Sequence, residues 1–177
     1  MPYSEDIRQL NSIDDIINYC HNALPLDFKR SPWTHPELQH GVNLLASEVA
    51  LNCYMSAYGD MHATKCRAAM MNFPFNDIQG SIEIVDWGCG QGIGSATIIE
   101  VLRQRDLLQW LRKVTLIEPS HCAIERAYQN IRTITRGTVE IDVKNQFLPA
   151  SGNVEGETLS PIGYRYNNVI HVFSNIL

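Results

Sequence analysis

The chain has 177 residues, 45% of them hydrophobic, and its 19 acidic and 14 basic residues give a formal net charge of -5. This length is sufficient for one buried core, and the scattered charge contains no basic run that would support nucleic-acid binding. No stretch approaches the ~18 consecutive apolar residues of a transmembrane helix, and the N-terminus lacks a signal-peptide pattern. We therefore expect a soluble cytoplasmic protein without a membrane partner.

The five cysteines are odd in number, widely spaced and never in a CxxC arrangement. This usage disfavours both a disulfide framework and a zinc site. We expect reduced thiols that mostly fill the core, and no bound metal.

The first part of the chain, residues 1–75, has helical patterns and no convincing strand. Ser12, with Asp15 three positions later, predicts the start of a helix over IDDIINYCHNAL that ends before Pro25. A second, long helical pattern runs from Glu37 toward Met71 and ends before Pro74. We expect this segment to form a helical lid.

The second part, residues 76–177, alternates between strand and helix patterns. The long apolar face that includes Ala123 and Ile131 predicts a helix, and alternation over 139–143 predicts a strand. Residues 151–164 are expected to form a loop. Such alternation indicates an α/β fold with a parallel sheet and right-handed crossovers. The other expected elements are strands at Ser81–Val85, Val114–Ile117 and Val169–Phe173, and helices at Ile93–Gln104 and Leu107–Lys113.

A glycine-rich stretch, IVDWGCGQGIGSATII, joins the first strand to the next helix. Glycine in regular structure costs roughly 0.5–1 kcal/mol relative to alanine, so the repeated glycines suggest that a ligand approaches the backbone closely. Dinucleotide enzymes use GxGxxG here, but the third glycine of that pattern would fall on Ile93 or Ser95. Asp86 at the strand end would repel a pyrophosphate and favour a cationic ligand.

The sequence from Asp86 to Gly92, DWGCGQG, resembles the first motif of class I S-adenosylmethionine-dependent methyltransferases, an acid followed by GxGxG. A second match is LIEPS, in which Glu118 ends the next strand. The resemblance implies a Rossmann-like domain over 76–177, with S-adenosylmethionine as cofactor and methyl transfer to an unidentified acceptor as activity. The separation between the two motifs is longer than usual for that family.

The resemblance also implies site residues. Gly88, Gly90 and Gly92, with Cys89 between them, would contact the methionine part of the cofactor, and Asp86 would face its ammonium group. Glu118, followed by Pro119, would accept hydrogen bonds from the two ribose hydroxyls. Further candidates are Asp142 and Val143 for adenine, and Phe173 and Ser174 near the sulfonium; Asp142 could equally be a solvent-facing strand residue.

Catalytic candidates lie in two places. His171, in the fourth strand, could act as a general base, although a histidine inside an apolar strand is more often a hydrogen-bonded core residue. In the long helix, Tyr54, Tyr58, His62 and Lys65 recur at helical spacing and form a polar aromatic stripe. This stripe could line the mouth of the pocket, with Tyr58 and His62 acting on the acceptor, or could simply pack against the sheet.

Members of this family usually have seven strands, and the chain ends at Leu177, after the fourth. We therefore expect either a truncated chain or a partner, which could be a second copy, covering the edge of the last strand. Two rival functions stay open: a non-catalytic binding or scaffold domain with this fold, and, less favoured, an NAD-dependent oxidoreductase.

Overall fold

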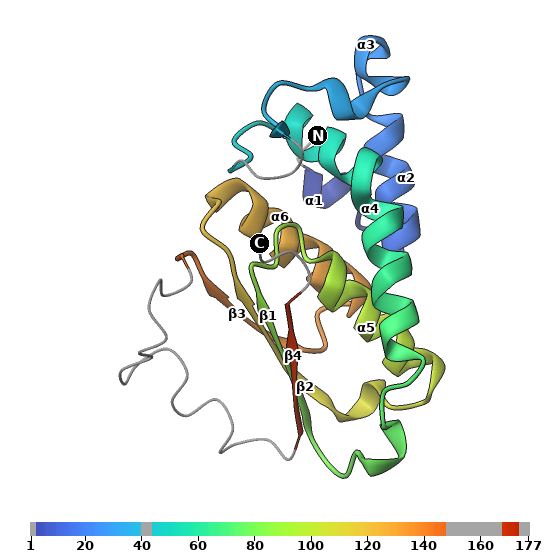
Figure 1. Ribbon diagram of the computed structural model, residues 1–177. Helices are drawn as coiled ribbons and strands as arrows, with labels where there is room; N and C mark the ends of the chain where they lie inside the picture. Colours follow the sequence, from blue (N-terminus) through green and yellow to red (C-terminus); the bar gives the residue numbers. More distant parts are fainter. Residues whose placement is uncertain (1–2, 40–43, 148–167, 174–177) are drawn as a thin grey trace.

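A four-stranded parallel sheet forms the centre of the computed structural model, which describes residues 3–39, 44–147 and 168–173 (Figure 1). Helices α5 (Ile93–Gln104) and α6 (His121–Ile134) are the crossovers that follow the first and second strands. The sheet has the order β3-β2-β1-β4, so the strand before the glycine turn is central. The fold is α/β and Rossmann-like, as the sequence predicts. The strands are β1 (Ile82–Trp87), β2 (Leu111–Ile117), β3 (Glu140–Lys144) and β4 (Asn168–Val172).

The N-terminal helices pack into the same core as the sheet. Ile16 from the second helix, Met55 from the fourth and Ile84 from β1 are fully buried members of one hydrophobic cluster. The segment that precedes the sheet is thus part of a continuous core. Its elements are α1 (Tyr3–Asp6), α2 (Ile13–Asn22), α3 (Leu26–Lys29), η1 (Pro32–Thr34), α4 (Glu48–Met70) and η3 (Phe75–Asp77). A further short turn, η4 (Leu108–Trp110), lies between α5 and β2.

The two faces of the sheet differ in what covers them. Alternate residues of a strand point to opposite faces, so Ile84 packs against the helices whereas Val85 and Trp87 point the other way. Among the described residues, the small cluster on that second face contains strand side chains only. In Figure 1, α2 and α4 run along the side of the sheet where α5 lies.

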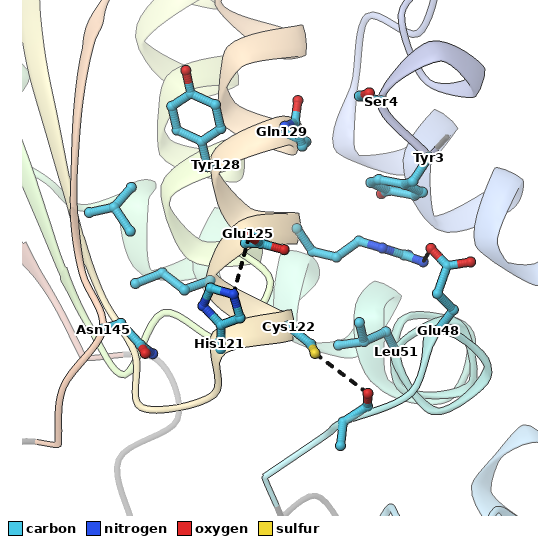
Figure 2. Close-up of a pocket in the computed structure, with 14 residues that line it drawn as sticks. Tyr3, Ser4, Glu48, Leu51, His121, Cys122, Glu125, Tyr128, Gln129 and Asn145 are labelled. Carbon is cyan, nitrogen blue, oxygen red and sulfur yellow. Dashed lines mark hydrogen bonds and ion pairs between the residues drawn. The ribbon is translucent and has the colours of Figure 1, made fainter. Parts of the chain in front are cut away.

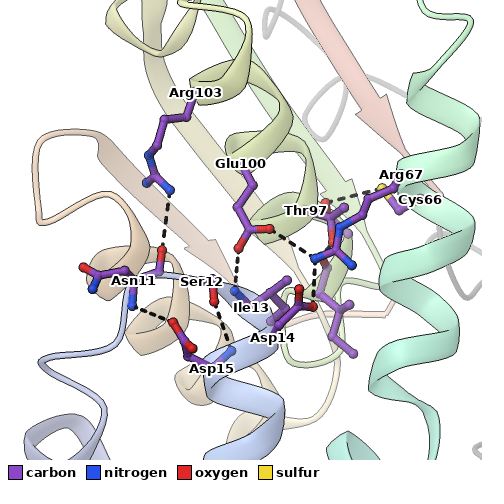
Figure 3. Close-up of polar contacts among 12 residues, drawn as sticks. Asn11, Ser12, Ile13, Asp14, Asp15, Cys66, Arg67, Thr97, Glu100 and Arg103 are labelled. Carbon is purple, nitrogen blue, oxygen red and sulfur yellow. Dashed lines mark hydrogen bonds and ion pairs between the residues drawn. The ribbon is translucent and has the colours of Figure 1, made fainter.

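A polar junction ties α2 to the crossover helix α5 (Figure 3). The Glu100 carboxylate, nearly buried on α5, accepts a hydrogen bond from the backbone N–H of Ile13 at the start of α2. It also accepts one from Arg67 of α4 at 3.3 Å, and Arg67 binds Asp14 at 2.8 Å. Ser12 completes the helix start by accepting a hydrogen bond from the N–H of Asp15, as predicted.

Helix α4 is shorter than the sequence pattern predicts. It begins at Glu48 instead of near Glu37, and Ser47 caps it by accepting a hydrogen bond from the N–H of Ala50. Glu37 anchors the two residues directly before the helix, because its carboxylate accepts hydrogen bonds from the N–H of Ala46 and the hydroxyl of Ser47. Helical periodicity could not reveal these long-range bonds.

The predicted helix over Leu107–Lys113 is wrong. Only a short 3-10 turn forms at Leu108–Trp110, and β2 begins immediately afterwards at Leu111. Leu111 pairs with Ile82 of β1 and is buried, so the pairing with a central strand outweighs the local helical pattern. The first crossover itself, α5, has the predicted bounds.

None of the helices in the described ranges is both long enough and apolar enough to cross a bilayer. All five cysteines lie in these ranges and are free thiols.

Candidate functional site

The glycine turn connects β1 to α5 at the carboxyl edge of the sheet. Gly88, Gly90 and Gly92 have φ angles of +64°, +52° and +77°, in the left-handed region that glycine adopts without strain. A Cβ atom on Gly92 would lie 3.2 Å from the Cβ of Ala127 in α6, whereas one on Gly90 would meet no atom within 4 Å. Gly92 therefore lets two helices approach closely, and Gly90 borders open space that a ligand could fill.

Asp86, the last acid of β1, is fully buried below this turn. Its Oδ2 atom accepts hydrogen bonds from the backbone N–H and the hydroxyl of Ser95, at 3.1 and 2.7 Å. The pKa of Asp86 is raised to about 7, mainly by burial; the bonds from Ser95 oppose the rise, and the nearby Glu118 carboxylate adds to it. Within the described residues its Oδ1 atom has no hydrogen-bond partner. A buried acceptor without a partner is costly, so this position favours a ligand that brings a donor or a positive charge.

Glu118 directly follows β2, at the strand end where the sequence places it, and its carboxylate reaches the glycine turn. Its Oε2 accepts a hydrogen bond from the backbone N–H of Gly90 at 3.0 Å, and its Oε1 accepts one from that of Ser120 at 2.9 Å. Burial raises the pKa of Glu118, and these two bonds oppose the rise. A carboxylate oxygen can accept about two hydrogen bonds, so each oxygen retains capacity for a ligand hydroxyl.

Cys89, within the turn, has a structural position. Its backbone N–H donates to the carbonyl of Ile117 at 3.0 Å, and its side chain is 4% exposed. Burial raises the pKa of the thiol well above its usual value, with Asp86 and Glu118 adding to the rise. A neutral buried thiol is a poor nucleophile, so Cys89 could contact a ligand through its backbone but has no reactive role.

Helix α4 lies against the turn and the start of α5. The side-chain amide of Gln91 donates to the carbonyl of Leu51 at 3.0 Å, and the Cys66 thiol lies 3.7 Å from the carbonyl oxygen of Gly94. The backbone carbonyl of Gln91 accepts a hydrogen bond from the side-chain amide of Asn130 in α6 at 2.9 Å. The turn is thus fixed between two helices.

The predicted aromatic stripe forms a cluster on the same stretch of α4. The rings of Tyr54 and Tyr58 are 5.3 Å apart, and the Tyr54 hydroxyl lies 3.3 Å from Nε2 of His62. Burial lowers the pKa of His62, and the positive charge of Lys65 lowers it further. The stripe therefore presents a neutral imidazole on the helix that contacts the turn.

Asp142 and Val143 of β3 are not brought to the glycine turn. Asp142 pairs in register with Thr115 in the middle of the sheet, and its carboxylate binds Lys113 at 3.4 Å. The residue at the carboxyl end of the strand is instead Asn145, whose side-chain amide donates to the carbonyls of Glu118 and Pro119, both at 2.9 Å. Sequence reasoning missed Asn145, although its place directly after an alternating strand was a usable signal.

His171 and Phe173 lie on the face of the sheet opposite to Asp86. The indole N–H of Trp87 donates to Nδ1 of His171 at 3.1 Å, and the rings of Trp87 and Phe173 stack at 5.9 Å. Because indole can only donate, Nδ1 is the acceptor and a neutral His171 carries its proton on Nε2. This geometry leaves His171 no free lone pair for a base. Ser174 lies outside the described residues.

A cavity of about 700 Å³ lies beside the site, between α1, the start of α4, α6 and the end of β3 (Figure 2). Val143 and Asn145 line it, but the glycine turn, Asp86 and Glu118 do not. Figure 2 shows an ion pair between His121 and Glu125 on its wall, at 3.3 Å. In the described part of the chain, no three His, Cys, Asp or Glu side chains are arranged to hold a metal ion.

Comparison with known proteins gives little further information. No family model matches the chain, and no curated protein matches it. One similar solved structure is a SAM-dependent methyltransferase of the DUF858 family from Leishmania major, with 14% sequence identity and a TM-score of 0.36. The match covers 76% of this chain and 40% of that one. At this level of similarity, the activity of one protein cannot be assigned to the other.

Proposed function

We propose that the chain binds S-adenosylmethionine at the glycine turn. The observation that carries this proposal is the buried Asp86, whose Oδ1 has no partner among the described residues; the open space at Gly90 supports it. Among the charged groups of residues 3–39, 44–147 and 168–173, the one that shifts the pKa of Asp86 is another carboxylate, Glu118, which raises it. The turn is therefore electronegative, which favours a cationic ligand and disfavours a pyrophosphate.

The residues around the turn match the parts of this cofactor. Asp86 would hold the ammonium group, and Gly88, Gly90 and Gly92 would lie along the methionine chain. Glu118 would accept hydrogen bonds from both ribose hydroxyls with the oxygens that already hold Gly90 and Ser120. Because these bonds are formed beforehand, the carboxylate needs no rearrangement to receive the sugar.

We further propose that the chain transfers a methyl group to an acceptor that is not yet identified. When bound, S-adenosylmethionine supplies a methyl group activated by the adjacent positive sulfur. The protein then has to align the acceptor, exclude water and, for a weak nucleophile, remove a proton. On α4, His62 is neutral and half-buried beside Tyr54 and Tyr58, and it is a better candidate for that base than His171.

Two other functions make different predictions. An NAD-dependent oxidoreductase would need to accommodate a pyrophosphate beside two buried carboxylates. A non-catalytic binding domain would bind the cofactor at the same residues but transfer no methyl group.

The test measures binding and transfer separately. Calorimetry should detect binding of S-adenosylhomocysteine but not of NAD. A His62→Gln variant should still bind S-adenosylhomocysteine. Incubation of a cell extract with the protein and methyl-labelled cofactor should label an acceptor fraction, and H62Q should label it more slowly. Binding of NAD alone would overturn the proposal, and cofactor binding without any labelling would favour the non-catalytic domain.

A further inference from the structure

A second cavity, of about 860 Å³, lies at the carboxyl end of α6. Residues of α1, of the segment that joins α1 to α2, and of the carboxyl end of α6 line it. Leu10 is its one large apolar side chain, and three arginines, Arg8, Arg132 and Arg136, contribute to its wall. The glycine turn, Asp86 and Glu118 do not line this cavity. The cavity is therefore distinct from the proposed cofactor site.

The charge of the cavity is unbalanced. Within the described residues, no carboxylate lies within 4.0 Å of the guanidinium group of Arg8, Arg132 or Arg136. Arg132 donates to the hydroxyl of Tyr128 at 3.4 Å, and Arg136 donates to the side chain of Asn11 at 2.6 Å. Glu5 is the only carboxylate in the lining. In a chain with a net charge of -5, this concentration of positive charge requires an explanation.

The end of α6 does not by itself account for the arginines. Cations are favoured at the negative end of a helix dipole, but Arg103 of α5 already donates to the terminal carbonyl of Ile134 at 2.6 Å. Arg136 has a φ of +54° because it ends α6 in the left-handed conformation, with the N–H of Gly137 donating to the carbonyl of Arg132 at 2.9 Å.

We propose that this cavity binds a small molecule that carries a diphosphate group. A guanidinium offers paired N–H donors that match two phosphate oxygens, so three of them suit an anion with more than one phosphate group. The volume lies within the range of about 300–1,000 Å³ that is usual for small-molecule sites. The proposal does not depend on the cofactor bound at the glycine turn.

The test uses calorimetry at constant ionic strength, with inorganic pyrophosphate and ADP as probes. We expect both probes to bind to the full chain. The R132Q variant should bind each probe about tenfold or more weakly, because it loses one charge-assisted hydrogen bond to phosphate. The control R112Q removes the same charge from an exposed position on β2, outside the cavity, and should leave the affinity unchanged. Equal weakening by both variants, or no binding by either probe, would overturn the proposal.

A second variant separates binding from folding. Arg136→Gly replaces a strained residue with one that tolerates the same φ, so we expect the melting temperature to hold or rise while pyrophosphate affinity falls. A lower melting temperature with unchanged affinity for pyrophosphate would overturn the proposal. It would show that the role of Arg136 is limited to its hydrogen bond with the Asn11 side chain. Binding of a single-stranded RNA oligonucleotide without any binding of pyrophosphate would also overturn it.

Discussion

Ionisation of Asp86 should control cofactor affinity. The pKa of this fully buried carboxyl is raised to about 7, and a ligand ammonium group would bind its charged form. If only the charged form binds, the apparent affinity follows the ionised fraction, about 0.1 at pH 6 and about 0.8 at pH 7.5 for that pKa. Calorimetry with S-adenosylhomocysteine should therefore show an increase in affinity of about eightfold over this range.

The control for this prediction is Asp86→Asn, which keeps the bonds to Ser95 but cannot ionise. This variant should bind more weakly and with a flat pH profile between 6 and 7.5. A steep profile in the variant, or a flat one in the wild type, would refute the reasoning.

The same raised pKa predicts a trend in stability. Between pH 4 and 7 the folded chain keeps the Asp86 proton while the unfolded chain, whose pKa is near 3.8, releases it. The free energy of unfolding should consequently fall as the pH rises through this window, by up to about 4 kcal/mol in the absence of ligand. Urea unfolding at several pH values should show that the free energy of unfolding falls more steeply with pH in the wild type than in Asp86→Asn. Identical pH dependence in the two proteins would assign the trend to other groups.

Three further predictions concern single side chains. Gly90→Val should abolish S-adenosylhomocysteine binding. The control is Gly137→Val: Gly137 also has a left-handed backbone and open surroundings, so this variant should lose stability but keep its affinity. Equal affinity in the two variants would mean that the glycine turn has a purely structural role. Glu118→Gln should lower the affinity for S-adenosylhomocysteine, measured by calorimetry, by roughly tenfold or more. The same variant should lower the affinity for a 2′-deoxyribose analogue of this ligand much less. Glu100→Ala should lower the free energy of urea unfolding by about 2–3 kcal/mol, because it leaves the start of α2 without its acceptor. As a control, Glu140→Ala, at an exposed position, should lower the free energy of unfolding by under about 1 kcal/mol. Similar losses in the Glu100 and Glu140 variants would mean that the polar junction between α2 and α5 contributes little to stability.

The sequence predicted the parts of the fold that depend on local pattern. The bounds of α5 and the strand character of β1, β3 and β4 follow from periodicity and from the glycine turn. The start of α4 and the start of β2 could not be predicted, because each depends on a distant partner. Glu37 holds the segment before α4, and Ile82 pairs with the beginning of β2.

The same distinction applies to the site. Asp86, Gly90 and Glu118 were assigned to one site by the resemblance of two motifs, and the structure brings Glu118 to Gly90 through a hydrogen bond. Two readings of Asp142 stayed open at the level of sequence, because an alternating strand gives the face of each side chain but not the point where pairing ends; in the structure it is paired within β3 and binds Lys113. The partner of His171 could not be read from the sequence, since Trp87 lies on another strand.

The position of Gln91 between two helices has a consequence for protein engineering. Its side-chain amide donates to the carbonyl of Leu51 in α4, and its backbone carbonyl accepts a hydrogen bond from the side chain of Asn130 in α6. Shortening the chain to the sheet alone would remove one of these anchors and expose the apolar side of α5. An excised domain would therefore be a poor reagent for ligand screening, and crystallisation or selection campaigns should retain the helices that precede the sheet.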